Sequence, residues 1–350
     1  MGYLQLPQSE KRSTYGLALL NEPFVLIANR GGPNLENQHI GKGSSRECVI
    51  TFCIMTLHRT PWLKRSVSSI REYCPVEYLT KILSQGKPDQ ELTHYLEELG
   101  DERIQLIISP VNLGYGGGRK LLSELVSTQF VMMMDDDVYL TEGAIESALR
   151  VFQTNPEVGA LTMPLYDLQG RMMALGGRNM IIKNGVIHWQ IPKLSLEACW
   201  TEANDLSGGA ILYRIELGDS FSWDPRAADF EDYDKSLQII RKGKWKQAIV
   251  PSGRLVHDRS WLGHVEEYDK IRLDGMSWRR SYRYIRAKWG LRFDMRSHVL
   301  YELVYPALAL TRCGWLVSAF NKFVQTRATR GKRPFMREPG QTGRLVHQGS

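Results

Sequence analysis

The chain has 350 residues, of which 43% are hydrophobic and 24% are charged, as in an ordinary globular protein. This composition excludes a mainly disordered, collagen-like or coiled-coil chain, and the length predicts two domains or one large domain with extensions. Five Cys without a Cys-x-x-Cys pair exclude a disulfide scaffold and give no sign of a zinc ribbon. We therefore expect a reduced, cytoplasmic compartment.

The positive charge lies near the C-terminus. Residues 266–350 hold 17 Lys and Arg against 7 Asp and Glu, a net +10, whereas the rest of the chain carries −3 of the total +7. The segment Trp278–Trp289 interleaves aromatic and basic residues. Three interpretations stay open: a helix packed on the main domain, peripheral contact with the inner face of a membrane, and, less expected, nucleic-acid binding.

Membrane insertion and secretion are not expected. The longest apolar stretch, residues 299–320, contains Glu302, Pro306 and Arg312, and charges inside a membrane span are costly. The N-terminus shows no apolar run behind a basic start, so no secretory signal is predicted.

The pattern along the chain predicts an N-terminal extension (1–46), a main domain (47–265), a basic helical region (266–326) and a disordered tail (327–350). In the main domain, apolar runs and helical spacings alternate. Strands are predicted at 48–55, 78–83, 104–109, 130–134, 159–163, 171–175, 180–182, 185–189 and 245–250, and after the turn at Ser207. Helices are predicted at 61–73, 90–99, 118–128, 144–153 and 232–242.

Alternating strands and helices predict a parallel sheet with right-handed crossovers. Ligands of such sheets bind beyond the carboxyl ends of the strands. The segments that follow the first four strands of the main domain should therefore surround one crevice. They are Thr56–Arg59, Ser84–Lys87, Asn112–Arg119 and Asp135–Asp137.

Three consecutive carboxylates, Asp135–Asp137, follow an apolar strand. They repel one another there, and a divalent cation would relieve that cost, because carboxylate oxygens suit Mg²⁺ or Mn²⁺. Such an ion could hold a nucleotide diphosphate. The alternative is an acidic loop that caps the next helix.

Three weaker signals accompany the acidic run. Residues 112–120 (NLGYGGGRK) predict a glycine-rich loop whose following helix favours an anion. Glu231 and Asp232 at a helix start are either a general base or capping residues. His257 after a strand is either structural or a metal ligand.

In chain order these runs resemble a family 2 glycosyltransferase with the GT-A fold, over roughly residues 47–260. The runs are CVITFCIMTLHRT, NLGYGGGRKLL, FVMMMDDDVYL, DLSGGAILYR and FEDYDKSLQIIRKG. The resemblance implies an α/β fold with a Rossmann-like, mostly parallel sheet flanked by helices. Here a basic helical region follows that domain.

The resemblance also implies roles for single residues. Asp135 and Asp137 match the outer positions of the DxD-type motif that binds Mn²⁺ or Mg²⁺, and His257 falls where some GT-A enzymes place a further metal ligand. Asp232 matches the usual base, with Glu231 beside it as a second catalytic residue. The implied donor-binding residues are Thr56, His58, Arg59, Gln85, Gly114, Arg119, Lys120, Asp135, Asp136, Gly208 and Gly209.

Two departures leave the nucleotide open. The family usually has an Asp after the second strand that holds the base, whereas Leu83–Lys87 has none, and Lys120 stands where Asn is usual. A UDP-sugar is favoured over a GDP- or dTDP-sugar. The acceptor is a glycan, a lipid-linked sugar, a peptide or a small molecule.

The sequence therefore predicts a metal-dependent, inverting glycosyltransferase that moves a hexosyl or N-acetylhexosaminyl group to a hydroxyl. Two alternatives stay open. One is a nucleotidyltransferase, although the residues after the first strand of the main domain are not the glycine-rich, basic loop that such an enzyme uses. The other is a non-enzymatic module that binds an anion through the basic C-terminal region.

Overall fold

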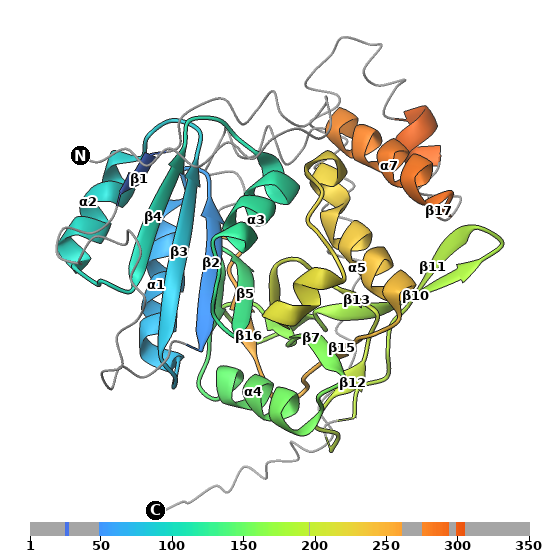
Figure 1. Ribbon diagram of the computed structural model, residues 1–350, viewed down its shortest axis with the longest axis horizontal. Coiled ribbons are helices and arrows are strands. Elements are labelled where there is room, and N and C mark those ends of the chain that lie inside the picture. The colour runs from blue at the N-terminus through green and yellow to red at the C-terminus, as the bar shows by residue number, and fades with distance from the viewer. Residues whose placement is uncertain (1–24, 28–48, 196, 261–274, 294–298, 305–350) are drawn as a thin grey trace, which may run out of the picture.

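The computed structural model describes residues 25–27, 49–195, 197–260, 275–293 and 299–304. Figure 1 shows a large sheet with helices on both faces, and α2 and α7 at opposite ends of the molecule. The α-helices are α1 (Thr60–Tyr73), α2 (Gln90–Leu99), α3 (Gly114–Glu124), α4 (Ala144–Thr154), α5 (Glu231–Lys242) and α7 (Gly275–Trp289). Shorter helical turns are η2 (Ile215–Asp219), η3 (Pro225–Phe230) and η4 (Leu300–Val304).

The strands form one large and two small sheets. Those of the large sheet are β1 (Val25–Ile27), β2 (Ile50–Thr56), β3 (Tyr78–Gln85), β4 (Ile104–Ser109), β5 (Phe130–Asp135), β7 (Val158–Thr162), β12 (Thr201–Glu202), β14 (Ala210–Arg214) and β15 (Lys246–Ile249). One small sheet holds β6 (Val138–Leu140), β8 (Leu165–Tyr166), β9 (Met172–Ala174) and β16 (Leu255–His257). The other holds β10 (Gly177–Lys183), β11 (Val186–Gln190), β13 (Asp205–Leu206) and β17 (Arg292–Phe293).

The large sheet confirms the predicted α/β fold. Its strand order is β1-β4-β3-β2-β5-β14-β7-β15-β12. The strands β2, β3, β4, β5, β7 and β15 run in one direction, and β1, β12 and β14 run in the other. The sheet is thus mostly parallel, with β14 inserted antiparallel between β5 and β7. The strand β1, from the predicted N-terminal extension, pairs with β4 at the edge.

Alternate residues of β2 and β5 face two different cores, because successive side chains of a strand point to opposite faces. Phe52 and Met132 pack in the core that also contains residues of α1, α2 and α4. Cys53 and Met133 pack in the core that contains residues of α3 and α5. Burial on both faces explains why these strands are continuous apolar runs.

The glycine-rich segment is not a loop before a helix, as predicted, but the first part of α3 itself, which begins at Gly114. Its glycines allow close packing. A Cβ at Gly116 would lie 2.4 Å from the carbonyl oxygen of Asp224, and one at Gly118 would lie 2.4 Å from the sulfur of Met55. Glycine thus permits α3 to approach η3 and β2 closely. In the sequence, this run of glycines looks like a phosphate-binding loop.

The helix α7 packs on the main domain. Tyr282 and Ile285 are buried in a third core together with Phe230 of η3 and Leu237 of α5. On the same side, Lys288 Nζ donates hydrogen bonds to two carboxylates of the domain, and Trp289 and Tyr284 donate one each. These aromatic residues therefore face the domain, which supports the packed-helix interpretation of the basic region for residues 275–289.

The remaining predictions for the C-terminal region are not tested by the structure. The tail predicted at 327–350 and most of the apolar stretch 299–320 lie outside the described residues. None of the helices in the described residues has the length and apolar composition that a membrane span requires.

Candidate active site

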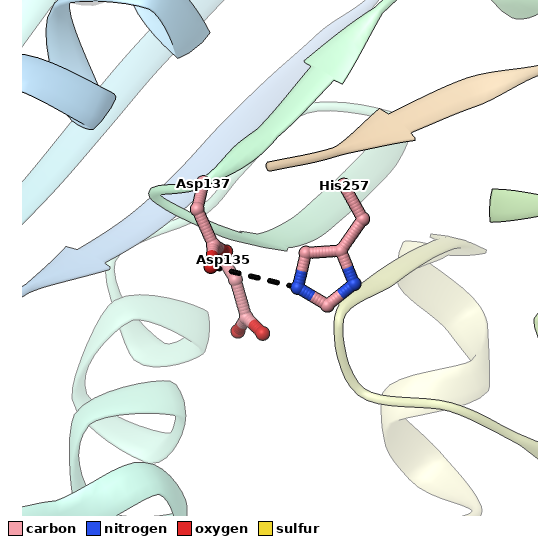
Figure 2. Close-up of side chains that lie close together, drawn as sticks. All are labelled: Asp135, Asp137 and His257. Atoms are coloured by element: carbon pink, nitrogen blue, oxygen red, sulfur yellow. Dashed lines mark ion pairs between the residues drawn. The ribbon is translucent and has the colours of Figure 1, made fainter. Parts of the chain in front are cut away.

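The acidic loop at the end of β5 meets His257 through a strand pairing that the sequence does not reveal. The strand β16 runs antiparallel to β6, which brings His257 beside the loop. His257 Nε2 lies 3.5 Å from Asp137 Oδ2. The potential ligand atoms of Asp135, Asp137 and His257 all lie within 4.8 Å of one another. Figure 2 shows these three side chains close together. The structure therefore brings together the three predicted metal ligands.

The electrostatics of this cluster favour a cation. Burial raises the pKa of Asp135 above its ordinary value; Arg119 acts to lower it, whereas Asp137 adds to the rise. An ionised Asp135 is thus destabilised by its surroundings. Two carboxylates and one imidazole form a ligand set that suits Mn²⁺, and the carboxylates also suit Mg²⁺.

The middle carboxylate of the acidic loop pairs with Arg59. Asp136 is fully buried, and its Oδ2 accepts a hydrogen bond of 3.1 Å from Arg59 Nε. A second guanidinium nitrogen of Arg59 donates to the other oxygen of Asp136, and Nη1 lies 3.3 Å from Asp137 Oδ2. Arg59 itself is only 3% exposed. These contacts favour a structural role for Arg59 and Asp136, which tie the loop after β2 to the acidic loop, over the donor contact that the resemblance implies.

Arg119 is the centre of a buried network. Its Nη1 donates to Glu231 Oε1 at 2.7 Å and to Asp232 Oδ1 at 2.9 Å. Its Nη2 donates to the carbonyl oxygen of Gly208 at 2.7 Å and to Asp135 Oδ1 at 3.3 Å. The guanidinium therefore connects the two predicted catalytic carboxylates, Glu231 and Asp232, to the predicted metal cluster. Burial acts to lower the pKa of Arg119, but the three carboxylates outweigh it and raise that pKa.

The two predicted catalytic carboxylates differ in environment. Burial, reinforced by the charge of Asp232, raises the pKa of Glu231 to about 8 although Arg119 opposes the shift. The side chain of Glu231 is 7% exposed, whereas that of Asp232 is 25% exposed. Asp232 is also fixed in orientation, because its Oδ2 accepts a hydrogen bond of 2.7 Å from the Gly208 backbone N–H. Asp232 is thus the carboxylate that a substrate can reach.

These residues surround a cavity of about 210 Å³. Its wall is formed by residues from α3, the end of β5, the turn before β14, η3, the start of α5 and the segment after β16. The lining residues are Tyr115, Arg119, Asp135, Ser207, Gly208, Gly209, Asp229, Phe230, Glu231, Asp232, Tyr233, His257 and Arg259. The cavity is thus lined by both predicted catalytic carboxylates and by two of the three predicted metal ligands, Asp135 and His257.

Several predicted donor-binding residues lie outside this cavity. Thr56 is buried, and its Oγ1 has no hydrogen-bond partner among the described residues. Gln85 is buried, and its Oε1 accepts a hydrogen bond of 2.8 Å from the Leu113 N–H at the start of α3. His58, in the loop after β2, has a φ of 53°, which is uncommon for a residue other than glycine.

Two further predicted residues on α3 also lie outside the cavity. Gly114, with a φ of 67°, starts the helix, and its N–H donates to Asn112 Oδ1 at 2.8 Å. Lys120 is 44% exposed and pairs with Glu124 at 3.9 Å. Adjacent residues of a helix point about 100° apart, so Lys120 does not share the environment of Arg119.

Sequence reasoning missed Arg259, Tyr115 and Asp229, which also line the cavity. Arg259 is exposed and lies two residues after His257. The intervening Asp258 is fully buried and accepts hydrogen bonds from Arg65 Nη1 at 2.8 Å and from Tyr139 Oη at 2.9 Å. Asp258 thus anchors the segment that carries both residues. The signal available in the sequence was a run of His, Asp and Arg directly after a short strand.

No curated protein sequence matches the chain. The crystal structure of S. aureus TarS 1-349 is 13% identical, with a TM-score of 0.47 over 72% of this chain and 77% of that one. A further S. aureus TarS crystal structure is 12% identical, with a TM-score of 0.46 over 70% of this chain and 44% of that one.

The family comparison identifies the main domain. Residues 51–192 match the family model described as "Glycosyl transferase family 2". The match contains the acidic loop and α3 but ends before the catalytic pair, Glu231 and Asp232, and before His257. It favours a glycosyltransferase over the nucleotidyltransferase that the sequence left open, and it does not include the basic C-terminal region. Residues 51–192 are therefore assigned to a family 2 glycosyltransferase domain.

Proposed function

We propose that the protein is a metal-dependent, inverting glycosyltransferase that moves a hexosyl or N-acetylhexosaminyl group from a nucleotide sugar to an acceptor hydroxyl. The observation that carries this proposal is the Arg119 network. It joins the Glu231–Asp232 pair to Asp135, and so sets a candidate base beside a candidate metal cluster in one cavity.

Asp135, Asp137 and His257 would hold the metal, because their ligand atoms lie close together and Asp135 is destabilised in its charged form. When bound, Mn²⁺ or Mg²⁺ neutralises charge on the departing nucleoside diphosphate. Arg59 and Asp136 support the site from behind by holding the loop in place.

Asp232 would accept the proton of the acceptor hydroxyl as that oxygen attacks the anomeric carbon. Its position favours this role, because it is the more exposed carboxylate of the pair and both of its oxygens are held by hydrogen bonds. Glu231, with a pKa of about 8, is mostly protonated near neutral pH and is therefore less available to accept a proton. Attack from the face opposite the leaving group gives inversion.

Arg119 already contacts three carboxylates, so we assign it to holding the base rather than to the diphosphate. The exposed Arg259 is the better candidate for the diphosphate, because it lines the cavity next to a candidate metal ligand. A guanidinium binds phosphate oxygens with two parallel hydrogen bonds. Stabilising the departing charge in this way would speed the transfer.

The donor is proposed to be a UDP-sugar, with GDP- and dTDP-sugars as alternatives. The acceptor is proposed to be a glycan, a lipid-linked sugar, a peptide or a small molecule. The cavity lining suits a polar substrate, since carboxylates, arginines and tyrosines border it.

The first test measures binding of UDP, GDP, dTDP and CMP by thermal shift, each with and without Mn²⁺. A ligand that binds only the folded state raises the melting temperature, so we expect one nucleotide to raise it only with Mn²⁺. Asp137→Asn should remove the shift, whereas Asp219→Asn, at an exposed position outside the cavity, should keep it. A protein that binds none of these nucleotides in the presence of Mn²⁺ contradicts the proposal.

The second test follows transfer from the matching nucleotide sugars by release of the nucleoside diphosphate, with the product anomer assigned by NMR. Asp232→Asn should abolish transfer and leave Mn²⁺-dependent nucleotide binding intact. Loss of both would contradict the assigned role of Asp232. A product with retained configuration would contradict the inverting mechanism.

A further inference from the structure

The segment η3 lies directly before the helix α5 that begins with the catalytic pair, and α7 packs on it. Two η3 residues, Asp229 and Phe230, line the active-site cavity. Figure 1 shows α7 beside the N-terminal end of α5. The helix α7 lies outside the residues that match the family model.

The backbone of η3 is strained next to the catalytic pair. Ala228 has a φ of 37° and a ψ of −88°, a combination that L-residues rarely adopt. Such a conformation persists only when the surrounding structure holds it. Ala228 is three residues before Glu231. Contacts that hold the backbone at Ala228 therefore also fix the position of the first turn of α5.

Two serines of α7 supply that hold. Ser277 Oγ donates a hydrogen bond of 2.7 Å to Asp229 Oδ2, and the Asp229 N–H donates one of 3.3 Å to Ser281 Oγ. Both serines lie one turn apart on the helix face that meets η3, and Ser281 is 1% exposed. The residue after the strained Ala228 is thus bound through both its backbone and its side chain.

The other end of η3 is anchored by the same helix. Asp224, which caps η3, accepts hydrogen bonds from Tyr284 Oη and from Lys288 Nζ. On the opposite side, Gly116 of α3 packs against the Asp224 backbone. The segment η3 is therefore held between α3, which carries Arg119, and α7.

We propose that Ser277 and Ser281 are positioning residues of the transfer reaction. By holding Asp229, they fix the first turn of α5 and thereby the direction in which Asp232 faces the acceptor. This inference rests on the proposed function, because it assigns the base role to Asp232. In this proposal, α7 contributes to catalysis by positioning Asp232.

The test uses the full chain with both serines replaced, Ser277→Ala with Ser281→Ala, and a second variant with both replaced by Thr, which keeps the hydroxyl donors and acceptors. The control is Arg283→Gln, because Arg283 lies on the same helix but is 54% exposed and pairs with Glu302. Hydrogen–deuterium exchange of residues 225–236 and binding of Mn²⁺ with UDP are measured for each. The steady-state assay follows UDP release from UDP-glucose and UDP-N-acetylglucosamine.

We expect the double Ala variant to exchange faster over residues 225–236. Its kcat should fall between about tenfold and a hundredfold, since small misplacements of a catalytic group have effects of that size. Binding of Mn²⁺ with UDP should stay unchanged, and the double Thr variant should recover most of the kcat. Arg283→Gln should behave as wild type in every assay.

Unchanged exchange over residues 225–236, or a kcat within twofold of wild type, would overturn the inference. An equal loss of kcat in Arg283→Gln would also overturn it, because the effect would then belong to the helix as a whole. A wild-type protein that neither binds Mn²⁺ with UDP nor releases UDP would count against the proposed UDP-sugar donor instead. The exchange result would then still decide whether α7 holds the start of α5.

Discussion

Replacing Glu231 by Gln should stabilise the protein at neutral and alkaline pH. The carboxyl group is buried, and its pKa of about 8 lies well above the ordinary value of 4.5. Between these two values the folded state binds more protons than the unfolded state. The free energy of unfolding therefore falls as pH rises through this window. Gln has the same shape as protonated Glu and keeps an oxygen that accepts from Arg119, but it does not titrate.

The magnitude follows from the size of the pKa shift. Each pKa unit corresponds to about 1.4 kcal/mol. The wild type should thus lose about 3 kcal/mol of unfolding free energy relative to Glu231→Gln by pH 7, and about 4 kcal/mol by pH 8. Near pH 5 the difference should be below about 1 kcal/mol. Burial is the main cause of the raised pKa. Arg119 opposes it but contacts three carboxylates, so it does not fully compensate the charge of Glu231.

The assay is urea denaturation followed by tryptophan fluorescence at pH 5, 6, 7 and 8, with EDTA present throughout. Glu216→Gln, at an exposed position of η2, is the matched control and should give a difference that does not change with pH. A pH-independent difference for Glu231→Gln would refute the reasoning. So would a variant that becomes less stable than wild type at pH 8, because that result would mean that Arg119 keeps Glu231 ionised.

Three further predictions concern neighbouring contacts. Gly208→Ala should lower the rate of transfer by about a hundredfold, because the new Cβ would lie 2.2 Å from Asp232 Oδ1. Nucleotide affinity should stay intact. Steady-state kinetics measure the rate and calorimetry the affinity, and full activity would contradict the prediction. Arg59→Met should cost about 3–5 kcal/mol in urea denaturation, since it leaves the fully buried Asp136 without its cation; unchanged stability would show that Asp136 is neutral. Arg259→Gln should weaken Mn²⁺-dependent nucleotide binding by about tenfold or more, the size of a charge-assisted hydrogen bond, and unchanged affinity would remove Arg259 from the donor site.

The elements most accurately predicted are those with a strong local pattern. The helix 90–99 and the strand 104–109 have the predicted bounds. Asp89 caps this helix by accepting a hydrogen bond from the Leu92 N–H, and Gly100 ends it in the left-handed conformation. Capping residues at both ends make such a helix readable from sequence.

The elements that were missed depend on distant partners. The strand β16 has three residues and exists because it pairs with β6 and β8. The turn η3 contains Ala228 in a conformation that its sequence does not favour. The glycines of α3 predicted a loop, since glycine disfavours helices. In the structure they lie in the helix, where a larger residue would clash with η3 or β2.

The candidate site was predictable in its residue types and less so in its contacts. Asp135, Asp137 and His257 were expected as metal ligands and lie together. Arg119 was expected at a phosphate, and nothing in its local sequence shows that it faces carboxylates that follow it by more than one hundred positions. The same holds for Asp136, whose partner Arg59 lies 77 positions earlier.

The antiparallel direction of β14 separates two ends of the same short segment. Because β14 runs against β5, the residues before it, Gly208 and Gly209, reach the acidic loop, and Arg214 pairs with the opposite end of β5. The chain therefore leaves the catalytic edge along β14, about 14 Å in length, and returns through η2 and η3. A Cβ at Gly218 in η2 would meet nothing within 4 Å. That turn is thus a place to attach a fluorophore or surface anchor that leaves the substrate entrance open.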